Sequence, residues 1–260
     1  MLGLLCFMQL VMFCNYSEPG GPQASILVSA VGSKIYAASI NPAILKTLNS
    51  SQVAASYARP YNLLAYTSIL ANYSSWGLSL ATLGIDNYQE AELKLGTGFA
   101  IGHGLFYGLS LANKLLITNT RKRLAWPALN LGLLLDTQGR PEPKLPLRQL
   151  AVVIENLNYP WGHTDEEAWP VTLRLAGLFM PQKNLSLACE VKRTQNIAEL
   201  SFGSEFLIGT HWALRLGYHT NPTLYGCGLG LNFNRLEFDY GLRYHPRLKE
   251  TSILSLSVRL

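Results

Sequence analysis

The feature that most constrains the fold of this chain is a period-two alternation of large apolar residues with small or polar ones. It begins near Gln52, continues to the C-terminus, and comes in segments of about ten residues separated by Gly, Pro, Asn and Ser. Between residues 236 and 244, for example, Leu, Phe and Tyr occupy the even positions, and Glu, Asp, Gly and Arg the odd ones. Such alternation places successive side chains on opposite faces of a β-sheet and is not the period of a helix.

Fourteen such segments can be counted after residue 51. An even number of strands brings both ends of a closed antiparallel barrel to the same side. The connections also alternate between tight turns and longer polar loops, an asymmetry typical of outer-membrane barrels. One segment breaks this rule, because residues 137–147 fall on the short side and yet are long and Pro-rich. The predicted strands are 52–58, 65–73, 76–83, 90–102, 105–117, 125–136, 148–156, 170–179, 184–193, 197–207, 211–219, 223–232, 235–245 and 251–260.

The composition excludes several other classes of protein. Only 14% of the residues are charged, against roughly 25% in an average soluble domain. The chain is too apolar to be disordered, and four cysteines in 260 residues do not form a disulfide-stapled mini-domain. No apolar stretch reaches the roughly 18 residues of a transmembrane helix.

The two faces of the predicted strands favour a membrane barrel over a soluble sandwich. Aromatic residues of the apolar face gather near strand ends, where a membrane interface places them. The other face is mainly Gly, Ser, Ala and Asn, with a few charges of both signs that can pair across a lumen. We therefore predict an all-β, transmembrane antiparallel barrel, and a large soluble β-domain is the alternative. The predicted lumen charges are Glu90, Glu92, Lys94, Glu155, Arg174, Glu190, Glu199, Arg215, Glu237, Asp239 and Arg243.

The amino terminus has the length and apolarity of a secretory signal. Residues 1–14 are apolar except for Gln9, and turn-forming residues follow. We expect a signal peptide over 1–24, with the cleavage site open. A buried first strand or helix, or a lipid anchor on Cys14, is the alternative. Residues 25–50 are then expected to form a plug, and 51–260 the barrel.

A short helix is predicted within the expected plug. Asn41 is a good N-cap, and Pro42 favours the first helical position, with Ala43 next. Ile44 and Leu45 would form the apolar face of this helix, which lies either in the lumen or on the outer surface. We expect lumen glycines to clear space for it, and Glu237, Asp239 and Arg243 to bind its backbone. These glycines are Gly96, Gly98, Gly108, Gly226, Gly228 and Gly230.

The Asn41-Pro42-Ala43 element, followed by Ile44 and Leu45, resembles the N-terminal segment of the PorV/FadL-like outer-membrane barrels. Residues 241–248 and the strand after them are similar to the closing hairpin of that family. The resemblance implies a fourteen-stranded barrel in the bacterial outer membrane, with N-terminal residues folded into the lumen. Two functions follow from it: passive transport of a small hydrophobic solute, or an accessory barrel of a secretion or surface-attachment system.

The sequence contains none of the common motifs of enzyme chemistry. It has no nucleophile elbow, P-loop or dinucleotide fingerprint, and its five histidines do not have metal-ligand spacing. We expect no enzyme activity, cofactor or metal. The net charge of +5 comes from scattered residues, so nucleic acid is not an expected partner. The expected partners are outer-membrane lipid and either a hydrophobic small molecule or an envelope secretion protein.

Overall fold

The computed structural model describes residues 28–32, 34–85, 88–118, 123–137, 146–158, 170–248 and 250–260. The expected signal peptide, residues 1–24, lies outside this part of the chain. No helix among the described residues is both long enough and apolar enough to cross a membrane.

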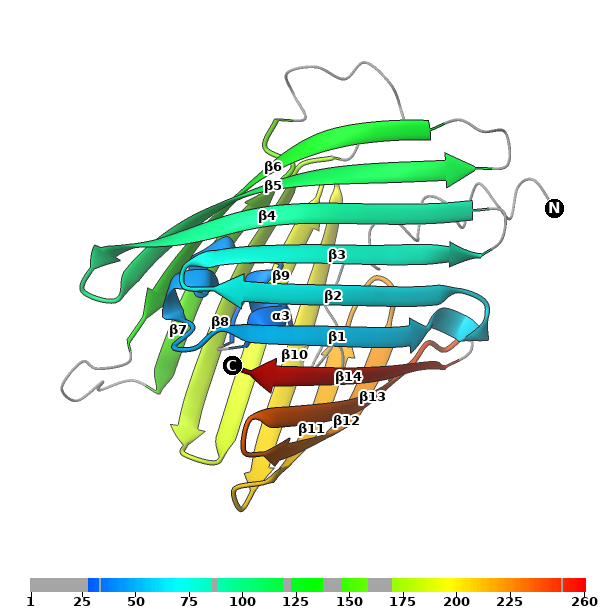
Figure 1. Ribbon diagram of the computed structural model, residues 1–260. Coiled ribbons are helices and arrows are strands. Elements are labelled where there is room, and N and C mark those ends of the chain that lie inside the picture. Colours follow the sequence, from blue (N-terminus) through cyan, green and yellow to red (C-terminus); the bar gives the residue numbers. More distant parts are fainter. Residues whose placement is uncertain are drawn as a thin grey trace.

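Fourteen strands form a single closed antiparallel barrel (Figure 1). Each strand pairs with its sequence neighbour, and β1 pairs with β14, from Gln52 opposite Arg259 to Arg59 opposite Ser252, to close the sheet. The strands are β1 Gln52–Arg59, β2 Ala65–Tyr73, β3 Trp76–Ile85, β4 Tyr88–Gly102, β5 Leu105–Thr118, β6 Arg123–Asp136, β7 Leu147–Glu155, β8 Thr172–Gln182, β9 Leu185–Thr194, β10 Ile197–Ile208, β11 Trp212–His219, β12 Leu224–Phe233, β13 Leu236–Tyr244 and β14 Thr251–Arg259.

The predicted all-β fold class and the count of fourteen strands are confirmed. The prediction succeeded because the period-two pattern follows the strands. The largest difference in bounds is at β8, which was predicted as 170–179 and extends to Gln182. Tight turns join the strands at one barrel end, which we call the turn end, except between β6 and β7, where ten residues intervene. At the turn between β4 and β5, His103 and Gly104 have φ of 53° and 79°, a left-handed conformation that glycine adopts without strain. At the opposite, loop end the connections range from two residues, between β3 and β4 and between β9 and β10, to sixteen between β7 and β8.

The outer face carries the apolar residues of each strand. Leucines such as Leu80, Leu95 and Leu214 are exposed in the middle of the strands. Tyr73 and Trp76 lie at the turn end, while Tyr218 and Tyr225 lie at the loop end with ring centroids 5.5 Å apart. An apolar band between two aromatic girdles is the surface that a membrane barrel presents to lipid.

The chain before β1 folds back into the barrel (Figure 1). This lumenal segment, residues 28–48 with Ser33 not described, contains the short helix α3 (Ile35–Ala38) and the 3₁₀ helix η1 (Pro42–Thr47). A second 3₁₀ helix, η2 (Pro60–Asn62), follows β1 at the loop end. Val28, Tyr36 and Ile44 of the lumenal segment have no exposed surface. The lumen is therefore occupied by the protein's own chain.

Candidate functional site

The element predicted from the Asn-Pro-Ala sequence is present as η1. Asn41 caps it, with its side-chain oxygen accepting a hydrogen bond from the Ala43 N–H at 3.1 Å, and Pro42 is the first helical residue. The Asn41 amide also donates to the carbonyls of Ala30, at 3.1 Å, and Leu133, at 3.4 Å. Asn41 thus fixes the helix, the start of the lumenal segment and strand β6 to one another.

A row of glycines on the barrel wall makes room for η1. Gly98, Gly108 and Gly132 lie side by side on β4, β5 and β6. A methyl group on Gly108 would collide with the backbone of Pro42 and Ala43, and one on Gly132 with Asn41. The three glycines form a trough that holds the start of η1, because their lack of side chains lets two backbones approach closely.

The glycine prediction was right at Gly96, Gly98 and Gly108 and wrong at Gly230. Gly96 and Gly98 adjoin Leu45 and Lys46 of the segment, as Gly108 adjoins its first turn. At Gly230, however, an added Cβ would lie 2.6 Å from the Arg215 guanidinium, so this glycine makes room for an ion pair. Gly132 and Gly77 were not predicted, although Gly77 would meet the Leu45 side chain.

The start of the lumenal segment is bound through its backbone by Glu190 of β9. The N–H groups of Ser29 and Ala30 both donate to Glu190 Oε2, each at 2.9 Å. Farther along, the Gly32 N–H donates to the side-chain oxygen of Gln149, also at 2.9 Å. Carboxylate acceptors make strong hydrogen bonds, so these contacts anchor the segment to the wall.

Arg174 of β8 holds Glu190 in position. Its guanidinium contacts Glu155 at 2.5 Å and Glu190 at 2.8 Å, and donates to Ser29 Oγ at 2.8 Å. Only 1% of the Arg174 side chain is exposed. The three predicted lumen charges therefore form one buried network that includes the lumenal segment.

A second network binds Lys34. Its ammonium group pairs with Glu237 of β13, and Arg215 of β11 contacts Asp239 at 2.5 Å and Glu205 at 2.6 Å beside it. Burial, and then the nearby Arg215 charge, lower the pKa of Lys34 to about 8.

The prediction that Glu237 and Asp239 bind the segment's backbone was wrong. Glu237 pairs with the Lys34 side chain, and Asp239 pairs with Arg215. Arg243, the third residue of that prediction, lies buried on β13. The backbone is instead held by Glu190, Gln149 and Lys94, because these groups face its unpaired N–H and C=O groups.

Lys94 of β4 contacts the middle of the segment. Its ammonium donates to the Ser39 carbonyl at 2.9 Å and pairs with Glu92 at 2.9 Å, which also lies 3.5 Å from Lys114. Glu90 accepts a hydrogen bond from the Tyr88 hydroxyl. Glu90 and Glu92 thus have separate partners within the lumen.

The last predicted lumen charge, Glu199 of β10, pairs with side chains of the neighbouring strands. Its carboxylate is 3.0 Å from the Lys192 ammonium and 3.7 Å from the His219 ring. All the buried acidic and basic side chains of the described strands, including these, lie on β4 to β13. We call this part of the lumen the charged wall.

The remaining strands, β14, β1, β2 and β3, form an uncharged wall. Closure between β1 and β14 places these four strands next to one another. Their inward residues contain no Asp, Glu, Lys or Arg over the following stretches: 251–257, 52–58, 66–72 and 77–83. This feature was missed, although its signal is visible in the sequence as the lack of charges at every second position of the first three strands and the last.

Two apolar clusters lie along the uncharged wall. At the loop end, Leu64 packs with four inward residues of the wall, namely Ala58, Tyr66, Leu83 and Ile253. Toward the turn end, Ile35 and Tyr36 of the lumenal segment pack on Ala54 and Leu70. Between them lie serines, among them Ser68, which is 4% exposed and whose hydroxyl has no hydrogen-bond partner among the described residues.

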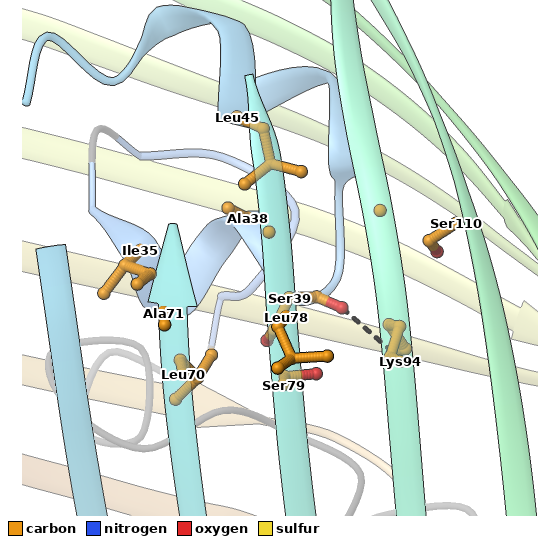
Figure 2. A pocket seen from close by; sticks show the side chains of 12 residues that line it. Ile35, Ala38, Ser39, Leu45, Leu70, Ala71, Leu78, Ser79, Lys94 and Ser110 are labelled. Atoms are coloured by element: carbon orange, nitrogen blue, oxygen red, sulfur yellow. Dashed lines mark hydrogen bonds between the residues drawn. The ribbon is translucent and has the colours of Figure 1, made fainter. Parts of the chain in front are cut away.

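A small cavity lies where the lumenal segment meets the uncharged wall (Figure 2). Leu45, Ile35 and Ala38 border it from the segment, and Leu70 and Ser79 from the wall. Lys94, with its bond to Ser39, closes the side nearest the charged wall. The volume of the cavity, about 20 Å³, is enough for roughly one water molecule.

No protein-family model and no curated protein matches the sequence. Solved structures match its fold over nearly the whole chain. The CymD monoaromatic hydrocarbon channel has a TM-score of 0.64 at 11% identity, covering 95% of this chain and 98% of that one. The Pseudomonas putida toluene transporter TodX has a TM-score of 0.60 at 10% identity, with 94% and 97% covered. A Pseudomonas aeruginosa FadL homologue has a TM-score of 0.57 at 9% identity, with 92% and 97% covered. At these identities the likeness establishes the fold, and function has to be argued from the lumen.

Proposed function

We propose that the protein is a channel of the bacterial outer membrane, related in fold to the FadL-type barrels, that lets a small hydrophobic solute pass passively. The single observation that carries this proposal is the division of the lumen into a charged and an uncharged wall. A hydrated pore for ions or sugars has no need of a charge-free stripe along its whole length. An apolar solute does need one, because displacing water from a charged group costs free energy.

The lumenal segment supports the same function. We propose that residues 25–50 are a plug, residues 1–24 a signal peptide, and 51–260 the transmembrane barrel. A fourteen-stranded barrel without a plug would enclose a water-filled space. The networks around Glu190, Lys34 and Lys94 bind the plug mainly to the charged wall. The plug packs on the uncharged wall toward the turn end, through Ile35 and Tyr36, so the loop-end part of that wall is the part available to a solute.

The structural likenesses agree with this proposal. The barrels that the chain resembles include a monoaromatic hydrocarbon channel and a toluene transporter, and neither is an enzyme. The alternative of an accessory barrel for an envelope secretion system stays a prediction, since no contact in the structure favours it.

Uptake of ¹⁴C-labelled toluene tests the proposal. The labelled solute is supplied to bacteria with an intact outer membrane that lack a hydrocarbon channel and express this barrel or an empty vector. We expect faster initial uptake with the barrel, and no increase for labelled benzoate, which carries a charge. Equal toluene uptake with barrel and vector, with the barrel shown to be inserted by its heat-modifiable migration, would contradict the proposal.

A further inference from the structure

We propose that Arg235 and Arg259, at the turn end of the barrel, form a binding site for the phosphate of an anionic phospholipid in the adjoining leaflet of the membrane. Short turns of outer-membrane barrels face the periplasm, so this leaflet is the periplasmic one. The inference rests on the proposed membrane location and is independent of the proposed solute.

Exposed charges are distributed unevenly between the two ends of the barrel. In the turns and strand ends of the turn end, the exposed lysines and arginines are Lys183, Arg235 and Arg259, and no acidic side chain described there is exposed. The one exposed carboxylate in the described part of the chain is that of Glu250, which lies at the loop end. The turn end therefore presents a positive rim, which attracts anionic lipid.

Pairing of β13 with β14 brings the two arginines together. Arg235 lies in the turn between β12 and β13, beside the C-terminal end of the chain (Figure 1), and Arg259 is the last residue of β14. The Arg259 N–H donates to the Arg235 carbonyl at 2.8 Å. The Arg259 guanidinium donates through Nη2 to the Asn234 carbonyl, also at 2.8 Å. These bonds hold the Arg259 side chain across the rim next to Arg235.

Neither arginine forms an ion pair with an acidic side chain of the described residues. The carboxylates of this part of the barrel have other partners, because Glu237 pairs with Lys34. Glu205 and Asp239 pair with Arg215. Like charges held next to each other on paired strands are destabilising, and an anion bound between them removes that repulsion. Guanidinium groups bind phosphate oxygens through two parallel N–H donors, so a phosphate matches this pair.

The surroundings of the two arginines favour a lipid as the source of the phosphate. Phe233 directly precedes the turn and Leu236 directly follows it, and both are exposed. Leu260, next to Arg259, is exposed as well. These side chains continue the aromatic girdle of the turn end, where the headgroups of a bilayer begin. A phospholipid offers a phosphate to the arginines and an acyl chain to the apolar residues, whereas a soluble anion offers only the phosphate.

Quenching of tryptophan fluorescence by brominated lipids tests the site. One barrel keeps only Trp212, which pairs with Leu231 near the turn between β12 and β13. The other keeps only Trp76, which is also exposed at the turn end but lies three strands away from β14. In each barrel the other tryptophans are replaced by phenylalanine. Brominated phosphatidylglycerol or brominated phosphatidylcholine is diluted into phosphatidylcholine bilayers. At low salt we expect Trp212 to report about a tenfold preference for phosphatidylglycerol, and Trp76 no preference.

Matched variants show whether the two arginines cause the preference. Arg235→Gln with Arg259→Gln should abolish it at Trp212, whereas Lys183→Gln, in the turn between β8 and β9, should leave it unchanged. Heat-modifiable migration shows that each variant is folded. Equal quenching of Trp212 by the two lipids, or a preference that survives the double change, would overturn the proposal.

A competition experiment distinguishes a lipid from a soluble anion. Sodium phosphate replaces sodium chloride at constant ionic strength, and the preference of Trp212 for phosphatidylglycerol should persist. Its loss would show that the arginines bind a soluble anion, and the lipid assignment would be wrong. None of these measurements depends on toluene uptake, so failure of this proposal and failure of the proposed function can be told apart.

Discussion

The two walls of the lumen are built from the same kind of strand, but they contact the lumenal segment in different ways. The charged wall binds it through defined polar contacts, such as Glu190 with the N–H groups of Ser29 and Ala30. The uncharged wall touches it mainly through apolar packing, such as that of Ile35 and Tyr36 on Leu70. Under the proposed function, one wall would position the lumenal segment and the other would serve the solute.

Removing the plug should have the largest effect, which is a rise in the conductance of the barrel. Deletion of residues 25–48 takes away every contact between the segment and both walls, which leaves a water-filled barrel. We expect the single-channel conductance in planar bilayers to rise by roughly an order of magnitude or more, as for an open barrel of this strand number. Heat-modifiable migration confirms that the barrel is still folded. Unchanged conductance in a folded, inserted barrel would show that the segment does not close the lumen.

Breaking the charged wall should cost the most stability. Arg174→Met leaves Glu155 and Glu190 buried without their partner, which we expect to lower the free energy of unfolding by about 3–5 kcal/mol. Urea unfolding in detergent, followed by tryptophan fluorescence, measures this loss. Arg193→Met, at an exposed position on the neighbouring strand β9, should change it by no more than about 0.5 kcal/mol. Similar losses in both variants would mean that the Arg174 network has no special role.

A bulky residue in the glycine trough should displace η1 and leave the barrel intact. The side chain added by Gly108→Val would overlap the backbone of Pro42 and Ala43. We expect the conductance to rise, by less than in the deletion, because the contacts of Ser29 and Lys34 remain. Ala55→Val adds bulk to the lipid-facing side of β1 and is the control. Wild-type conductance of a folded Gly108→Val barrel would place η1 away from the trough.

The smallest expected effect is a pH dependence of plug docking. Docking lowers the pKa of Lys34 from the ordinary 10.5 to about 8, so the undocked segment binds the proton more tightly. Docking is therefore favoured as the pH rises from about 8 to 10.5, and the full cost of burying the charge is present below 8. We expect the mean conductance to fall by about twofold over this range. Lys34→Met should abolish this change, and Lys46→Met, on the exposed side of η1, should keep it. A mean conductance that rises with pH over this range would show that docking of the segment does not lower the pKa of Lys34.

Most of the fold could be predicted from the sequence because strand periodicity is a local signal. The start and cap of η1 were predictable for the same reason, since Asn41 and Pro42 are neighbours in sequence. The site was harder to predict. Glu190 and Ser29 are separated by 161 positions, and which carboxylate reaches which N–H group depends on the closed barrel. The alignment of Gly98, Gly108 and Gly132 likewise depends on strand register.

A matched pair of lysines tests most directly the claim that solute follows the uncharged wall. Ser68 on β2 and Ser201 on β10 both point into the lumen, and each is 4% exposed. Ser68→Lys places a charge between Ser56 and Ala81 on the uncharged wall, whereas Ser201→Lys places it beside the carboxylates of Glu190 and Glu199. We expect Ser68→Lys to abolish most of the toluene uptake by cells and Ser201→Lys to retain it. Equal uptake by the two folded variants, or a loss in Ser201→Lys alone, would show that the solute does not follow the uncharged wall.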